Sequence, residues 1–143
     1  MDLREYLEMD WQQQLLIGPP SSPVLYREDS STGYGQIFAE TAADAINYAV
    51  GANIIDWQKC DYNDVDQRYA LWKELKNNNE FNIEMIALVL IRAANLAKLS
   101  NDYCSYSDQD IKSMFARYNG TNAQAIEYGR EAKGWYDIFE KYN

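Results

Sequence analysis

The stretch from Phe81 to Leu99 constrains the fold most, because apolar residues occupy nearly every face of the helix that it would form. Such a helix is expected to be surrounded by other helices. Its most apolar part, residues 83–97, carries Glu84, Arg92 and Asn95, so it is too short and too polar to span a bilayer. We therefore predict a helical domain with this stretch as its central, buried helix and with no membrane span.

The residues before this stretch contain four more segments with helical patterns. The first ends near Ile17, and a short one covers residues 24–28. After a loop, an alanine-rich helix is predicted over residues 39–48, with its alanines facing inward. Asn63 or Asp64 can cap the fourth helix by accepting hydrogen bonds from its first turn.

Two more helices are predicted after the central one. Ser107 with Asp110 forms a capping-box pattern before the first of them, and Thr121 with Gln124 repeats that pattern before the second. A break is expected between them at residues 118–120. Internal repeats and convincing strand pairs do not occur in the sequence, so the predicted class is mainly α, as a single domain over residues 1–143.

Composition excludes several classes of function. The net charge is −9 and no basic patch is visible, which argues against binding to nucleic acid. The chain has no histidine, which excludes His-dependent catalytic triads and the usual zinc sites. We expect no cofactor and no metal, because Asp61, Asn63 and Asp66 lack the glycine and glutamate of a calcium loop and suit helix capping. We expect Cys60 and Cys104 to be small buried residues and prefer this to the alternative that they form a disulfide.

The segment of residues 26–37 is where chemistry is expected. Glu28 ends a short predicted helix, and a loop of small residues that contains Gly33 and Gly35 folds back beside it. Glycines let a backbone approach a ligand closely or adopt positive φ, and Gln36 can both donate to and accept from a sugar. These features suit a glycan cleft. The alternative is an ordinary turn beside an exposed glutamate.

Several blocks of the chain resemble, in order, the motifs of the lysozyme-like superfamily, above all those of lytic transglycosylases and goose-type lysozymes. The blocks are residues 33–36 with 41–42, similar to the family's Gly-Leu-Met-Gln and Thr-Ala; residues 81–84, similar to its Asn-Ile block; residues 116–120, similar to its Ala-Tyr-Asn-Ala-Gly block; and residues 125–128, where the family has a tyrosine helix. The resemblance covers roughly residues 23–129 and implies a lysozyme-like helical domain with an active-site cleft.

The resemblance also implies roles for individual residues. Glu28 aligns with the glutamate that protonates the glycosidic oxygen, a task for which burial must keep the carboxyl protonated near neutral pH. Gln36 aligns with the glutamine that contacts the saccharide, while Tyr118 and Asn119 align with the pair that lines the cleft. Tyr34 stands where the family has an apolar or aromatic residue on the cleft wall, and its ring can stack on a sugar.

A second carboxylate would decide the mechanism. The family's serine after the glutamate is Asp29 here, so either Ser30 supplies the orienting hydrogen bond or Asp29 is that carboxylate; Ser30 and Gly35 complete the predicted substrate-binding residues. Retaining and inverting glycosidases need the partner at about 5 or 6.5–9.5 Å from the acid. The other candidates are Glu40, Asp44 and Asp56. Lytic transglycosylases instead use one acid and the substrate's own hydroxyl, and we prefer this mechanism.

Three functions are compatible with the sequence. The first is cleavage of the MurNAc-GlcNAc bond of peptidoglycan, by a lytic transglycosylase or muramidase. Such an enzyme could be an effector, a toxin domain or a phage-derived enzyme, and its expected protein partner is a cognate inhibitor or immunity protein. The second is a catalytically silent domain that binds glycan or protein, and the third is a small acidic inhibitor or immunity protein. Because residues 1–5 lack the features of a secretory signal, we expect delivery to the cell wall by another route or within a longer protein.

Overall fold

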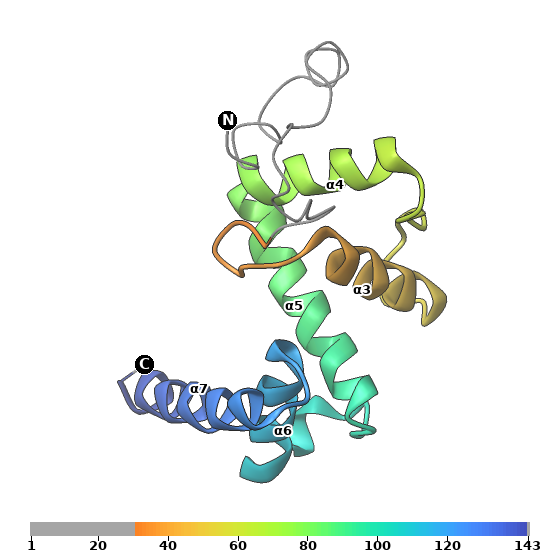
Figure 1. Ribbon diagram of the computed structural model, residues 1–143. Helices are drawn as coiled ribbons and strands as arrows, with labels where there is room; N and C mark the ends of the chain where they lie inside the picture. The colour runs from red at the N-terminus through yellow and green to blue at the C-terminus, as the bar shows by residue number, and fades with distance from the viewer. Residues whose placement is uncertain (1–30, 143) are drawn as a thin grey trace. The chain divides into compact units, whose positions relative to one another are not determined.

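Helix α5, Asn79–Leu96, is contacted by three other helices in this computed structural model (Figure 1). This arrangement agrees with its predicted place as the central helix. Its burial is incomplete, however, because Met85 is fully buried whereas Ile83 is 58% exposed. The prediction of a helix surrounded on every side is therefore correct for only part of its surface.

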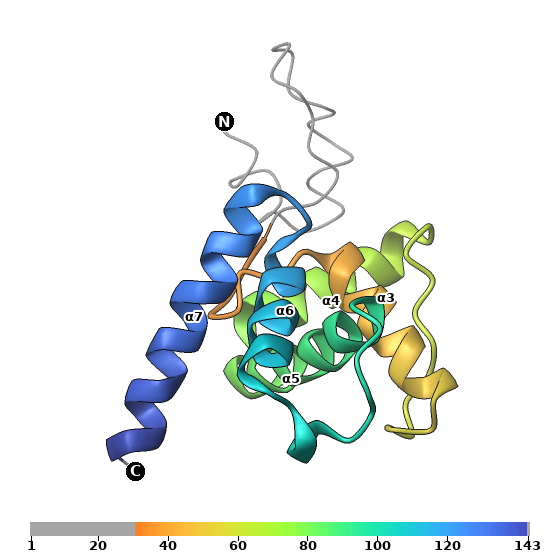
Figure 2. The ribbon, with the colours of Figure 1, turned by 90° about the horizontal axis from the view of Figure 1, so that it is seen from below.

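The structure describes residues 31–142, so the two helices predicted within residues 3–28 lie outside the described residues. The other α-helices are α3 (Ala39–Gly51), α4 (Val65–Asn77), α6 (Asp108–Asn119) and α7 (Ala123–Tyr142), with a short 3-10 helix at Tyr103–Ser105. Helices α3, α4 and α6 contact α5, and α7 lies along α6 (Figure 2). Within the described residues there are five α-helices and no strand, which confirms the predicted helical class.

Small residues form the buried face of α3, which contacts both α4 and α5. Ala42, Ala45 and Ala49 are fully buried and Ile46 is 5% exposed, as predicted for the inward face of this helix. Helices approach one another more closely where the side chains at the contact are small. Glu40, Thr41 and Asp44 of α3 are exposed on its other side.

Polar side chains cap α4 and α5. Asp64 accepts hydrogen bonds from the backbone N–H groups of Gln67, at 3.2 Å, and Asp66, at 3.0 Å, which confirms the predicted cap and lowers the pKa of its carboxyl. Asn78 ends α4 and also caps α5, since its side chain accepts from the Phe81 N–H at 3.1 Å. The two helices consequently meet at one residue.

The caps of α6 and α7 are predicted correctly in one case of two. The capping box of Ser107 and Asp110 is present, with both reciprocal hydrogen bonds. The predicted cap of α7 by Thr121 with Gln124 is wrong, because Asn122 accepts from the first-turn N–H at 2.9 Å instead. Asn and Thr are both good caps, so the pattern alone does not fix which of two neighbours serves.

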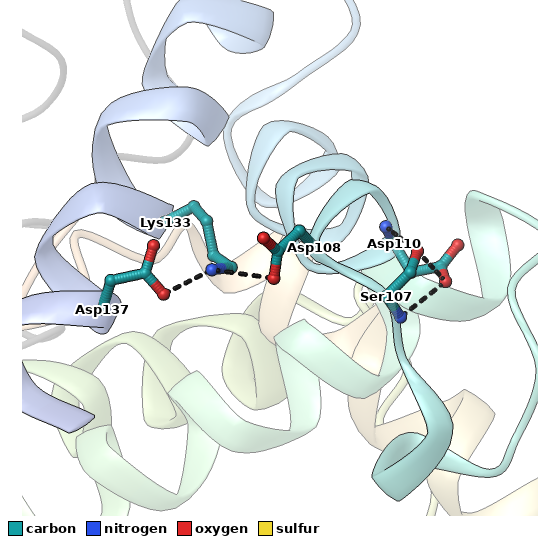
Figure 3. Close-up of polar contacts among 5 residues, drawn as sticks. All are labelled: Ser107, Asp108, Asp110, Lys133 and Asp137. Atoms are coloured by element: carbon teal, nitrogen blue, oxygen red, sulfur yellow. Dashed lines mark hydrogen bonds and ion pairs between the residues drawn. The ribbon is translucent and has the colours of Figure 1, made fainter. Parts of the chain in front are cut away.

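Lys133 joins α6 to α7 through two carboxylates (Figure 3). Its side chain is buried, and its ammonium group lies 3.1 Å from Asp108 at the start of α6 and also contacts Asp137, one turn further along α7. The hydrogen bond to Asp137, followed by that to Asp108, raises the pKa of the Lys133 ammonium. A buried cation is tolerated here because it is paired twice.

The cysteines differ from the prediction. Both are free thiols, and Cys104 is exposed, on a 3-10 helix that buries none of its residues. Cys60 is partly buried, and burial raises the pKa of its thiol. The expectation of two small buried residues is therefore wrong for Cys104.

Candidate functional site

Residues 32–37 form a closed loop. The backbone N–H of each end residue donates to the carbonyl of the other, both at 3.1 Å. Gly33 has a φ of 71°, and a Cβ there would lie 2.1 Å from the Asn82 amide nitrogen, so the position requires glycine on both grounds. A Cβ on Gly35 would lie 2.6 Å from Ile86 of α5. Of the two predicted uses of these glycines, positive φ is present at Gly33, and the close approach shown here is to protein atoms, including those of α5.

Asn82 of α5 holds this loop in place. Its side chain is 1% exposed, and its amide oxygen accepts from the Gly35 N–H at 2.8 Å. Its amide nitrogen donates to the carbonyl of Leu75 at 2.9 Å and to that of Thr32 at 3.3 Å. Each of these bonds goes to the backbone, so the buried amide fixes the loop to both α4 and α5.

Tyr118, in the last turn of α6, holds the loop from another element. Its hydroxyl donates to the Gly35 carbonyl at 2.7 Å. Burial, with a smaller contribution from Tyr128, raises the pKa of this hydroxyl to about 12. Gly35 is thus bonded through both its N–H and its carbonyl, to side chains from two different helices.

A cleft of about 690 Å³ opens beside the loop. This volume is within the range typical of ligand-binding pockets. Its walls come from the loop, from α3 and α5, and from the junction of α6 with α7. The lining residues are Tyr34, Gly35, Gln36, Ile37 and Phe38 from the loop; Glu40, Thr41 and Asp44 from α3; Val89, Arg92, Ala93 and Leu96 from α5; and Arg117, Tyr118, Asn119, Gly120 and Tyr128 from the junction.

Five of the predicted substrate-binding residues, Tyr34, Gly35, Gln36, Tyr118 and Asn119, lie together in this cleft. Gly35 and Tyr118 are 83 residues apart in the chain and in direct contact. Tyr34 is 72% exposed, so its ring is available to a ligand. The Gln36 side chain donates a hydrogen bond to the Gly33 carbonyl at 2.8 Å and thereby helps to close the loop.

The carboxylates proposed as a second catalytic group lie in different surroundings. Asp44 lines the cleft, where it accepts two hydrogen bonds from Arg92, at 2.7 and 3.1 Å. Arg92 also donates to Asn95 at 2.8 Å, so its guanidinium is held on both sides. Glu40 lines the same cleft, whereas Asp56 is exposed and is not among the described lining residues. The charge of Asp44 is therefore balanced by a fixed cation.

Glu28, Asp29 and Ser30 lie outside the described residues. Their predicted roles as general acid, second carboxylate and orienting hydroxyl remain predictions. The described site is the cleft beside the loop of residues 32–37.

Three polar residues of the site are not predicted by the sequence patterns. Asn82 and Arg117 belong to the blocks that resemble the lysozyme-like motifs, but the resemblance assigns them no role, and Arg92 lies in no such block. A signal existed for two of them, since Asn82 and Arg92 are polar positions within an otherwise apolar helix. A polar residue in such a place must find a partner or line a cavity.

Comparisons of the chain with protein-family models, with curated proteins and with solved structures give no match. Among residues 31–142, no helix is long and apolar enough to cross a membrane. No group of three or more His, Cys, Asp or Glu side chains in that range could hold a metal ion. Asp61 instead accepts from the Asn63 N–H at 2.9 Å in the turn before α4.

Replacing Tyr118 with Phe is expected to lower the free energy of unfolding by about 1 kcal/mol at neutral pH, because the Gly35 carbonyl loses its donor. The hydroxyl has an ordinary pKa of 10.0 and a pKa of about 12 in the folded protein. Its stabilising effect is therefore complete below pH 10 and is lost as the pH rises toward 12. Urea denaturation of both proteins at several pH values measures this difference. A constant difference up to pH 12 would contradict the assignment.

Proposed function

We propose that this domain binds the glycan strand of peptidoglycan in the cleft and cleaves it, with Glu28 as the general acid. One observation carries the proposal. Separate segments that resemble the lysozyme-like motifs, namely residues 33–36, 41–42, 116–120 and 125–128, all contribute residues to the lining of one cleft. Chance resemblance gives no reason for such distant segments to share a cavity. Glu28 enters the proposal through its place in the sequence, three residues before Ser31.

The chemical character of the cleft supports a sugar ligand. Tyr34 offers an exposed aromatic face, on which the apolar face of a sugar ring can stack. Val89, Ala93 and Leu96 supply apolar surface from α5, and Asn119 supplies an amide that can both donate and accept. A mixture of apolar surface with a few polar groups that fix orientation is typical of small-molecule sites.

The state of Asp44 supports a mechanism with one acid. A hydrolase needs a second carboxylate to activate water or to stabilise the developing cation. Both carboxylate oxygens of Asp44 already accept hydrogen bonds from Arg92, so this group is engaged with a cation of α5. In the alternative, Glu28 protonates the leaving oxygen as the glycosidic bond breaks, and the substrate's own C6 hydroxyl attacks the anomeric carbon and gives its proton to the Glu28 carboxylate, which closes an anhydro ring and restores the acid.

The products of digestion test this proposal. We expect purified protein to release peptidoglycan fragments that end in 1,6-anhydro sugars, detected by mass spectrometry. Hydrolysis would leave each new end heavier by one water. Reducing ends throughout, together with loss of activity in Asp44→Asn, would contradict the one-acid mechanism and would identify Asp44 as the second carboxylate.

The same assay separates the competing functions. Binding to peptidoglycan without any release of fragments would indicate a silent glycan-binding domain. A stoichiometric complex with a basic protein, in the absence of glycan binding, would indicate an inhibitor or immunity protein.

A further inference from the structure

Arg117 lies in the last turn of α6, next to Tyr118, and lines the cleft. Among the described residues it makes no hydrogen bond, ion pair or ring contact. The other arginine of the cleft, Arg92, is bound by Asp44 and Asn95 and lies over the ring of Tyr48. Arg117 therefore differs from Arg92 in having its guanidinium free to bind a molecule in the cleft.

The charge of the whole chain makes this position unusual. The chain has 22 acidic residues and 13 basic ones, so most arginine side chains are expected to lie near a carboxylate. The net charge of −9 also repels anions, and an anionic ligand would need a local cation to enter the cleft. A guanidinium binds a carboxylate through two parallel hydrogen bonds, which gives both affinity and a fixed orientation.

We propose that Arg117 forms a carboxylate subsite, so that the cleft selects an acidic glycan over a neutral one. The inference rests on the proposed function and deepens it by naming the substrate class. Tyr34 can stack on acidic and neutral sugars alike, whereas Arg117 can distinguish them. In peptidoglycan the carboxylate has two sources: the peptide stem, or the lactyl group of a muramic ring that has lost its stem.

Arg117 also has a structural alternative. A cation in the last turn of a helix interacts favourably with the partial negative charge of the helix end. That role needs only a positive charge, so Lys would serve as well as Arg. Binding to a carboxylate needs the planar guanidinium, so Lys would serve less well.

The test measures binding to three glycans of equal length: peptidoglycan strands with stems, strands from which an amidase has removed the stems, and chitin oligosaccharides, which carry no carboxylate. The protein carries Glu28→Gln to prevent turnover. We expect Arg117→Ala to weaken binding to an acidic glycan about tenfold, the effect of losing a charged hydrogen-bonded pair, and to leave binding to chitin within about twofold. Arg117→Lys should restore only part of the loss.

The control is Arg130→Ala, which removes an exposed arginine of α7 that is paired with Glu127 outside the cleft. It should leave all three affinities unchanged. A loss confined to strands with stems assigns the carboxylate to the stem, and a loss confined to stripped strands assigns it to the lactyl group.

An equal loss for chitin, no loss at all, or full rescue by Lys would overturn the carboxylate subsite while leaving the proposed function intact. Failure of the parental cleft to bind any of the three glycans would overturn both. Circular dichroism of each variant confirms that the fold is retained, and Arg117→Lys provides a second test if Arg117→Ala does not fold.

Discussion

Replacing Glu28 with Gln is expected to lower the rate of glycan cleavage at least about a hundredfold, the scale of losing a general acid. Gln has nearly the same shape as Glu but cannot transfer a proton to the leaving oxygen. Substrate binding should persist, because Tyr34, Tyr118 and Asn119 are unchanged. Release of soluble fragments from purified peptidoglycan measures the rate, and thermal denaturation measures the fold.

A matched variant separates this effect from a general change of charge. Glu131→Gln removes one carboxylate from an exposed position on α7 that does not line the cleft, and it should cleave at the parental rate. If Glu28→Gln also cleaves at that rate, Glu28 is not the acid. If both variants lose activity equally, the loss follows from net charge.

Replacing Asn82 with Leu is expected to lower the free energy of unfolding by about 3 kcal/mol or more. The substitution keeps a side chain of similar size but leaves the Gly35 N–H and the Leu75 carbonyl without their partner, while the Thr32 carbonyl keeps only its bond from the Ile37 N–H. Each buried group left unpaired costs about 1–3 kcal/mol. A domain of this size has a total stability of about 5–15 kcal/mol, so this loss is a large fraction of it. Urea denaturation measures the change.

A second substitution at this position identifies the cause. Asn82→Asp keeps the acceptor for the Gly35 N–H but turns a carboxylate oxygen toward two carbonyls. Burial and repulsion favour the protonated acid there, so this variant should be more stable near pH 4 than near pH 7 relative to the parental protein. Asn101→Leu, at an exposed position, is the control and should unfold at the parental urea concentration. Parental stability in Asn82→Leu would show that the bonds of Asn82 contribute little.

Much of the fold could be predicted because helix signals are local. Asp64 and the pair Ser107 with Asp110 are recognisable as caps from spacing alone, and they cap helices in the structure. The exposure of a helix face is not a local property. Trp135 and Phe139 lie four residues apart on α7, a spacing typical of the buried face of a helix, yet they are 65% and 68% exposed. Only the identity of the packing partner decides this, and the periodicity of one helix carries no information about it.

The residues of the cleft could be predicted only in part, because motifs are local whereas contacts between helices are not. Tyr34, Gln36 and Tyr118 were identified by motif, and they do lie together. The hydrogen bonds that hold the loop in place could not be predicted, because they join residues distant in the chain, such as Asn82 and Gly35. Ion pairs between helices, such as that of Asp44 with Arg92, depend on how two helices are placed, which no spacing rule specifies.

Helix α5 sets the distance between two walls of the cleft. Asn82 binds the loop and Arg92 binds Asp44 of α3, so two walls of the cleft are hydrogen-bonded to the same helix at positions ten residues apart. With a rise of 1.5 Å per residue, the attachment points are separated by about 15 Å along the axis. Adding or deleting one residue between them would rotate one anchor by about 100° relative to the other, so both walls could not be held at once. The dimensions of the cleft are therefore encoded in the residue count of a single helix, which tolerates substitution between its anchors far better than insertion.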